Sequence, residues 1–164
     1  MKIENKIEKL INEQIVHEMA SSNLYLSMSA YFADQNLTGF AHWMKLQAKE
    51  ELEHAMKFYD YLIDRGGRVK LGQIPAQPVE WESPLKAFQD AHKHEQDVTD
   101  LINNIINASI EEKDHATREF LNWFVKEQVE EEASADEIVQ KLKMVTTPGG
   151  LLMMDHSLGK RGKQ

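Results

Sequence analysis

The segment KEELEHAMKFY, residues 49–59, has the composition of a helix, yet two of its polar side chains fall where a buried face is expected. If Phe58 marks that face, a period of about 3.6 residues carries it back through His54 and Glu51. An unpaired charge is costly to bury, whereas a carboxylate and an imidazole three residues apart on one helix form a ligand pair. The spacing therefore raises the hypothesis of a metal site.

The same period places a carboxylate near the middle of each of four apolar stripes along the chain. These residues are Glu18, Glu51, Glu95 and Glu131. In a bundle of helices of similar length the midpoints share one height, so the four side chains are expected to converge. One glutamate beside an apolar stripe usually extends to solvent. Four buried carboxylates without counter-charge would instead cost many kcal/mol, far beyond the stability of a typical domain, about 5–15 kcal/mol.

Bound metal resolves this conflict, because two divalent cations would cancel four negative charges. Oxygen ligands with one imidazole suit iron or manganese better than calcium, and suit zinc less well.

An approximate internal repeat supports a paired site. A spacing of 33 residues separates Glu18 from Glu51, and the same spacing separates Glu95 from Gln128. The pair Glu51-x-x-His54 then corresponds to Gln128-x-x-Glu131. A Glu from each of two helices and Glu-x-x-His from the other two is the arrangement of di-iron carboxylate bundles. The second half of this chain departs from it, with Gln in place of Glu and Glu in place of His.

Long helices are needed to position these side chains, and the composition favours them. The chain of 164 residues has only 8 Gly and 4 Pro and no clear period-2 alternation, so an all-α fold is expected. Helical patterns cover about 3–33, 37–64 and 84–111, and a fourth runs from the turn at 113–117 to about 145. A long connection at 67–82 contains two Pro, while the others are short. This predicts a four-helix bundle at about 3–145 with a long crossover in up-down-down-up order. A short C-terminal helix is expected at about 149–159, in a single domain over 1–164.

Charge and composition exclude several classes of function. The formal net charge of −8 argues against nucleic acid and anionic membrane as main partners. The chain has no Cys, which excludes disulfides, thiolate metal sites, Fe–S clusters and Cys nucleophiles. The N-terminus is amphipathic, with Lys and Glu interspersed, unlike a signal peptide, and the longest apolar runs are too short to span a bilayer. We therefore expect a cytoplasmic protein.

The chain resembles the bacterial non-haem ferritins along essentially its whole length. The matching segments are HEMASSNLYLSMSAY, AKEELEHAMKFYDYL, HEQDVTDLIN and FLNWFVKEQVEEE, followed by the short C-terminal segment. The resemblance implies an iron-storage protein with a di-iron ferroxidase centre in each subunit and no haem. Fe(II) would be oxidised with O2 or H2O2 and deposited as ferric oxide inside a hollow cage of twenty-four identical subunits.

The resemblance also implies the ligands. One iron would bind to Glu18, Glu51 and His54, with Glu51 bridging to a second iron. The second iron would bind to Glu95 and Glu131, with Gln128 as a neighbour that positions oxygen or water.

Further roles follow from the same resemblance. Glu50, Glu127 and Glu130 would form a third iron site on the way to the cavity. Tyr25 would supply an electron when the oxidant is reduced, with Trp123 as a second donor. Glu53 and Glu132 are expected at the surface. No ligand position matches the remaining histidines, which are His17, His42, His92, His94, His115 and His156.

The apolar run Leu151–Met154 follows a Pro-Gly-Gly break and is better explained by burial between subunits than by exposure. Docking of this run onto its own bundle is the alternative.

Three other classes were weighed against iron storage. A haem-binding bacterioferritin would need Met at position 52, where this chain has Leu, and a second Glu-x-x-His. A rubrerythrin-type peroxidase carries a Cys-rich iron domain, which a chain without Cys cannot form. A di-iron oxygenase or reductase subunit would form a small oligomer and keep its metal, and a structural or signalling bundle with solvated carboxylates would bind no iron.

Overall fold

The structure is a computed structural model that describes residues 2–163. Within this range it contains five helices and no strand: α1 (Asn5–Asp34), α2 (Thr38–Asp64), α3 (Pro84–Glu111), α4 (His115–Met144) and α5 (Pro148–Leu158). The all-α fold with a short fifth helix is therefore confirmed. None of these helices combines the length and the hydropathy that a membrane span requires.

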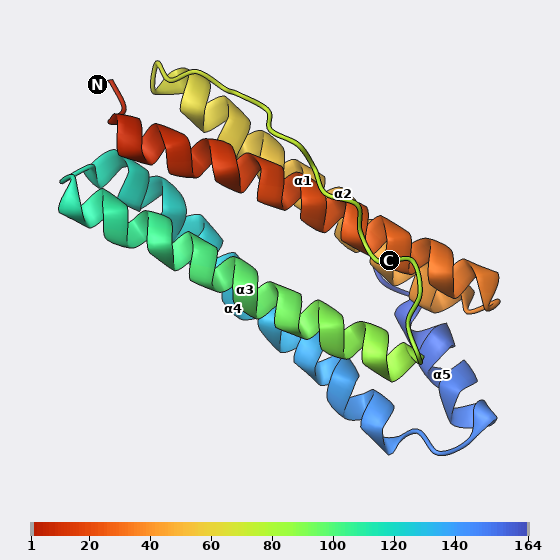
Figure 1. Cartoon of the computed structure of the whole chain (residues 1–164). Helices are drawn as coiled ribbons and strands as arrows, with labels where there is room; N and C mark the ends of the chain where they lie inside the picture. The colour runs from red at the N-terminus through yellow and green to blue at the C-terminus, as the bar shows by residue number, and fades with distance from the viewer. Residues whose placement is uncertain (1, 164) are drawn as a thin grey trace.

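Two helix hairpins make up the bundle, because α1 packs against α2 and α3 packs against α4. The segment between α2 and α3 runs lengthwise along the first hairpin, and α3 begins at the opposite end of the bundle (Figure 1). As a result α2 and α3 point in the same direction, and the four long helices follow the expected up-down-down-up order. The short helix α5 crosses the end of the bundle where α4 finishes.

The long crossover is held on α1 by side chains that satisfy its backbone. Asn12 donates from Nδ2 to the carbonyl oxygen of Arg68 over 2.9 Å and accepts at Oδ1 from the N–H of Lys70 over 2.6 Å. Further along α1, Ser27 donates from Oγ to the carbonyl oxygen of Pro78 over 2.5 Å. An extended segment without strand partners needs such acceptors and donors, so α1 fixes the path of the chain between the two hairpins.

The two hairpins are tied together where α2 ends and α4 begins. Asp114 caps α4 by accepting from the N–H of Thr117 over 3.1 Å. Its carboxylate also pairs with both terminal nitrogens of Arg65, each at 3.0 Å. Such a bidentate pair has a defined geometry. It joins the C-cap residue of α2 to the N-cap residue of α4, which begins at His115, inside the turn predicted at 113–117.

Two apolar clusters fill the bundle, one towards each end. The cluster nearer α5 includes Phe32, Phe40 and Phe88, and the cluster at the other end includes Ile7, Phe58 and Phe124. Every long helix contributes to both clusters, and each has one buried carboxylate between its two contributions: Glu18, Glu51, Glu95 and Glu131. The polar layer therefore sits between the two apolar clusters.

The helix α5 begins at Pro148, three residues before the apolar run Leu151–Met154. Thr147 accepts from the N–H of Gly150 over 3.1 Å, and Pro148 occupies the first turn. Both features are typical of a helix start. The Pro-Gly-Gly sequence is thus the beginning of the fifth helix.

The N-terminus of α2 has no capping side chain of its own, and α5 supplies one. Asp155 accepts at Oδ1 from the N–H of Gly39 over 2.8 Å and from the N–H of Phe40 over 3.0 Å. A carboxylate at a helix N-terminus satisfies free N–H groups and opposes the positive end of the helix dipole. A Cβ on Gly39 would lie 1.7 Å from the carbonyl oxygen of Asp155. Only glycine allows this approach.

In the apolar run Leu151–Met154, two side chains pack on the bundle and two face solvent. Leu151 and Met154 pack against the cluster nearer α5, whereas Leu152 is 62% and Met153 is 76% exposed. Leu151 and Met154 thus follow the alternative of docking onto their own bundle, because α5 turns one side towards it. For Leu152 and Met153 burial between subunits stays a prediction.

Gly39→Ala is expected to loosen α5 and to lower the thermal stability of the protein. The new methyl group would force Asp155 away from α2, and overpacking of this kind costs about 1–3 kcal/mol. The effect opposes the roughly 1 kcal/mol by which Ala is normally favoured over Gly within a helix. The measurement is the melting temperature together with the rate at which a protease removes the C-terminal segment.

Gly72→Ala is the matched control, because its Cβ would make only an ordinary contact of 3.6 Å with Val16. Equal melting temperatures and equal proteolysis rates for the two variants would contradict the proposed role of Gly39.

Candidate metal centre

Four carboxylates and one imidazole form the polar layer, and all four long helices contribute. Each of the five side chains is at most 7% exposed: Glu18 on α1, Glu51 and His54 on α2, Glu95 on α3 and Glu131 on α4. These five residues are called the metal centre below. The structure thus brings together the residues that the 3.6-residue period placed on the inner faces.

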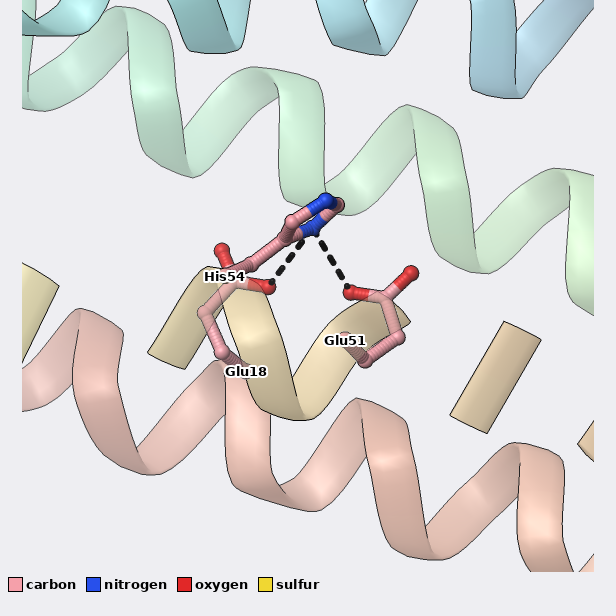
Figure 2. Close-up of side chains that lie close together, drawn as sticks. All are labelled: Glu18, Glu51 and His54. Carbon is pink, nitrogen blue, oxygen red and sulfur yellow. Dashed lines mark ion pairs between the residues drawn. The ribbon is translucent and has the colours of Figure 1, made fainter. Parts of the chain in front are cut away.

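Glu18, Glu51 and His54 form the first ligand group. One ligand atom from each lies within 4.8 Å of the others. The Nδ1 atom of His54 is 3.4 Å from Oε2 of Glu51 and 3.9 Å from Oε2 of Glu18. Figure 2 shows the three side chains pointing towards one another from two neighbouring helices. Two carboxylates and an imidazole at these separations suit a divalent transition metal.

Glu51, Glu95 and Glu131 form the second ligand group, again with one oxygen from each within 4.8 Å of the others. Glu51 belongs to both groups, so two cations bound there would share its carboxylate. The second group has no imidazole, as expected from the Glu that replaces His in the repeat. Two adjacent sites of different composition are the arrangement that the sequence predicted, and their occupancy by metal stays a prediction.

Hydrogen bonds orient three of the carboxylates. Gln14 donates to Oε1 of Glu18 over 2.7 Å, and Gln47 donates to Glu51 over 3.0 Å and to Glu131 over 2.8 Å. Partners that fix ligand orientation in this way also support metal affinity.

Glu95 is held from two sides. The hydroxyl of Tyr25 donates to Oε1 of Glu95, and Gln128 donates from Nε2 to its Oε2 over 3.2 Å and to its carbonyl oxygen over 3.1 Å. Gln128 therefore contacts the second ligand group through its amide nitrogen. Its role in positioning oxygen or water stays a prediction.

The second carboxylate oxygen of Glu18, Oε2, is buried without a hydrogen-bond partner among residues 2–163. A buried oxygen without a partner is costly. A cation bound between Glu18, Glu51 and His54 would remove that cost, so this atom supports a metal at the first ligand group.

Burial governs the acidity of the centre. Burial, and then the negative charge of Glu51, raises the pKa of Glu18 well above its usual range and raises the pKa of Glu131 to about 7. Burial and the charges of Glu51 and Glu131 also raise the pKa of Glu95 well above its usual range.

The pKa values of Glu51 and His54 instead shift so that the charged form of each is favoured. Burial alone would raise the pKa of Glu51, but its hydrogen bond and charge interaction with His54 lower it. Burial would lower the pKa of His54, yet contact with Glu51 raises it. Each group thus favours the charged form of the other, and binding of a metal ion to Nδ1 requires that nitrogen to be free of its proton.

The three residues assigned to a third iron site are not gathered into one group. Glu127 has a ligand atom within 4.8 Å of His54 and Glu131. Glu50 instead pairs with Arg161 over 2.7 Å, and Glu130 is exposed. The third site therefore stays a prediction, with Glu127 nearest to the metal centre.

The two residues assigned to electron transfer lie beside the centre at different depths. Tyr25 is fully buried and bonded to Glu95. The ring of Trp123 is 5.4 Å from that of His54, but it is 39% exposed, and Nζ of Lys57 lies 3.8 Å above it.

Among the flanking residues, Glu53 is exposed as expected, whereas the surface placement of Glu132 is wrong. The side chain of Glu132 is half-buried and accepts from Thr99 over 2.5 Å. The reason is that α3 packs closely on this flank of α4.

Two histidines without an assigned ligand role have structural partners: His94 contacts Ser21 over 2.7 Å, and His42 contacts the carbonyl oxygen of Arg161 over 2.8 Å.

Three contributors to the site lay outside the predicted set: Gln14, Gln47 and Arg161. Gln14 and Gln47 each precede a ligand glutamate by four residues, so an i, i+4 search for partners of buried carboxylates would have found them. No sequence signal indicated Arg161, because it reaches α2 from the far end of the chain.

Comparison with known proteins agrees with this geometry. Residues 8–145 match the family model described as a ferritin-like domain. A bacterial non-haem ferritin of Bacteroides fragilis is 47% identical over 159 residues, which cover 97% of this chain and 99% of that protein. A bacterial non-haem ferritin of Campylobacter jejuni is 37% identical over 93% of this chain and 92% of its own. The crystal structure of an open-pore ferritin from the archaeon Archaeoglobus fulgidus superimposes with a TM-score of 0.96 at 46% identity, covering 98% of this chain and 99% of that one.

Divalent metal binding is expected to weaken as the pH falls through about 7. A protonated carboxyl group does not bind a cation, and the pKa of Glu131 is raised to about 7. In the metal-free protein, the contribution of Glu131 to stability is fully present below its ordinary pKa of 4.5 and is lost as the pH rises through about 7. The measurement is the affinity for Co(II) by calorimetry at several pH values between about 6 and 8.

Glu131→Gln is the control, since it removes this titration while keeping the volume of the side chain. It should bind Co(II) more weakly and with a shallower pH dependence. An identical pH dependence in the two proteins would show that Glu131 does not titrate with the metal.

Proposed function

Because this chain belongs to the ferritin family, we propose that it stores iron and that its metal centre is a ferroxidase centre. Fe(II) is the substrate, and the product is a ferric oxide mineral kept inside a hollow cage of identical subunits. The observation that carries the proposal is the shared carboxylate of Glu51, which belongs to both ligand groups. A shared ligand holds two Fe(II) ions side by side.

Two adjacent ions suit the chemistry of the oxidants. Each Fe(II) gives up one electron, so a pair supplies the two electrons that convert O2 and two protons to H2O2, or H2O2 and two protons to two waters. Carboxylate oxygens favour the higher charge of Fe(III). The different composition of the two groups supports unequal affinity, because only the first group contains an imidazole. A weaker second site would help oxidised iron to leave for the mineral.

Reduction of O2 to two waters takes four electrons, two more than the iron pair supplies. Tyr25 is the proposed source of one of them, because its hydroxyl contacts a ligand carboxylate, Glu95, and an Fe(II) at the third site is the proposed source of the other. The proton of Tyr25 would pass to Glu95 as the electron leaves. Trp123 is the second candidate and lies beside His54. A transient tyrosine radical in wild-type protein that is absent from Tyr25→Phe would be the signature of this role, and an unchanged radical signal would exclude it.

Storage requires an enclosed volume, which one bundle does not provide. We therefore propose the cage of twenty-four subunits, with Leu152 and Met153 buried between subunits, since their exposure on α5 suits an interface. Iron would pass from the centre to the cavity by way of Glu127, with Glu50 and Glu130 completing the third site.

The haem-binding alternative is disfavoured by position 52, where Leu52 stands in place of a Met ligand. A di-iron oxygenase and a structural bundle differ in what they would do with added iron. Neither would retain large amounts of iron in a cage-sized particle.

Aerobic addition of Fe(II) is expected to give rapid oxidation. The protein should elute as a cage-sized particle that retains on the order of hundreds of iron ions or more. Glu51→Gln removes the charge shared by both ligand groups, so its initial rate of oxidation should fall at least about 10-fold. The measurements are the absorbance of Fe(III) with time and gel filtration with iron analysis.

Glu53→Gln is the matched control: it carries the same change two residues away on an exposed position of the same helix. It should oxidise iron at the wild-type rate. A small particle that keeps only a few irons would contradict storage, and equal rates for the two variants would contradict the assignment of the centre.

A further inference from the structure

Arg161, which follows α5, reaches back to the first hairpin and contacts one face of α2. Its Nη1 donates to the carbonyl oxygen of Trp43 over 3.2 Å, and its Nη2 donates to Oε1 of Gln47 over 2.9 Å and to Oε2 of Glu50 over 2.7 Å. The guanidinium carbon lies 4.4 Å from the centroid of the Trp43 ring. These partners follow one another along the helix, and together they hold the guanidinium in one place.

The contact with Gln47 determines which way the amide of Gln47 faces. A guanidinium only donates, so the amide must present its oxygen to Arg161. The amide nitrogen is then left to donate to Glu51 over 3.0 Å and to Glu131 over 2.8 Å. Gln47 is 1% exposed, so no bulk water competes for these bonds.

Glu51 and Glu131 come from different hairpins, and Gln47 contacts them both. If the amide were reversed, its oxygen would face two carboxylates, which only accept when ionised. Each ligand would then lose a donor, and the carboxylate shared by both ligand groups would be free to rotate. We propose that Arg161 is a positioning residue of the metal centre, acting through Gln47 on Glu51 and Glu131. The inference rests on the proposed function, because it assigns a role in holding the ligands of that centre.

The C-terminal segment is anchored well enough to perform this role. Asp155 caps α2, Leu158 is buried, and the carbonyl oxygen of Arg161 itself contacts His42 over 2.8 Å. Gly162 follows with φ of +71°, a backbone conformation that favours glycine. The chain thus runs along α2 from its first turn, and the side chain of Arg161 extends to Gln47, one turn from Glu51.

The test is an anaerobic titration with Co(II), whose visible absorption bands report the geometry of the bound ion. Loss of a partner of a metal ligand typically lowers affinity about 10–100-fold. We expect Arg161→Ala to lower Co(II) affinity roughly 10-fold and to shift the absorption bands, and Gln47→Leu to do the same. Arg161→Ala added to Gln47→Leu should cause no further loss, because the two residues act in series.

Controls separate positioning from general damage. Lys160→Ala removes a positive charge from the preceding exposed position and should leave affinity and spectrum unchanged. Gel filtration and the melting temperature show whether each variant assembles. If Arg161→Ala does not assemble, Arg161→Lys, which keeps the charge but lacks the planar fork, replaces it and should show a smaller loss of the same kind.

The outcomes distinguish this inference from the proposed function. Wild-type protein that fails to bind two Co(II) per subunit would contradict the ferroxidase centre. Wild-type binding together with unchanged affinity in Arg161→Ala would overturn the role of Arg161 alone. Fully additive losses in the double variant would also overturn it, because Arg161 would then act by a route that bypasses Gln47.

Discussion

Four carboxylates are buried between two apolar clusters: Glu18, Glu51, Glu95 and Glu131. The rest of the bundle must stabilise them there. Like charges this close oppose one another and lose the solvation they would have in water. Three features reduce this cost: His54 pairs with Glu51, amide groups donate to the carboxylates, and the pKa values of three of the four carboxyl groups rise. A site in this condition takes up cations readily, which is what a protein that handles Fe(II) requires.

The two halves of the bundle meet this constraint differently. The first hairpin supplies His54 beside its glutamates, whereas the second supplies Gln128, whose amide holds Glu95 in place. The repeat in the sequence therefore produces two neighbouring sites that share a ligand but differ in composition. A difference of this kind suits a centre through which iron passes, since one ion can be held while the other leaves.

Most of the fold and the convergence of the buried carboxylates could be predicted from periodicity. The 3.6-residue spacing identified the inward carboxylates because it is a property of each helix alone, and similar helix lengths brought their midpoints together. The half-burial of Glu132 was missed because it depends on the packing of α3 against α4. Arg161 was missed for a different reason. Its contacts join segments more than a hundred residues apart, and no spacing rule along one helix reports such a pairing.

The central claim is that two iron ions bind between these carboxylates. The most direct measurement is anomalous diffraction at the iron edge from crystals soaked in Fe(II) without oxygen. Two peaks are expected in each subunit, one among Glu18, Glu51 and His54 and the other among Glu51, Glu95 and Glu131. Crystals that hold iron elsewhere but show no peak at either position would contradict this claim.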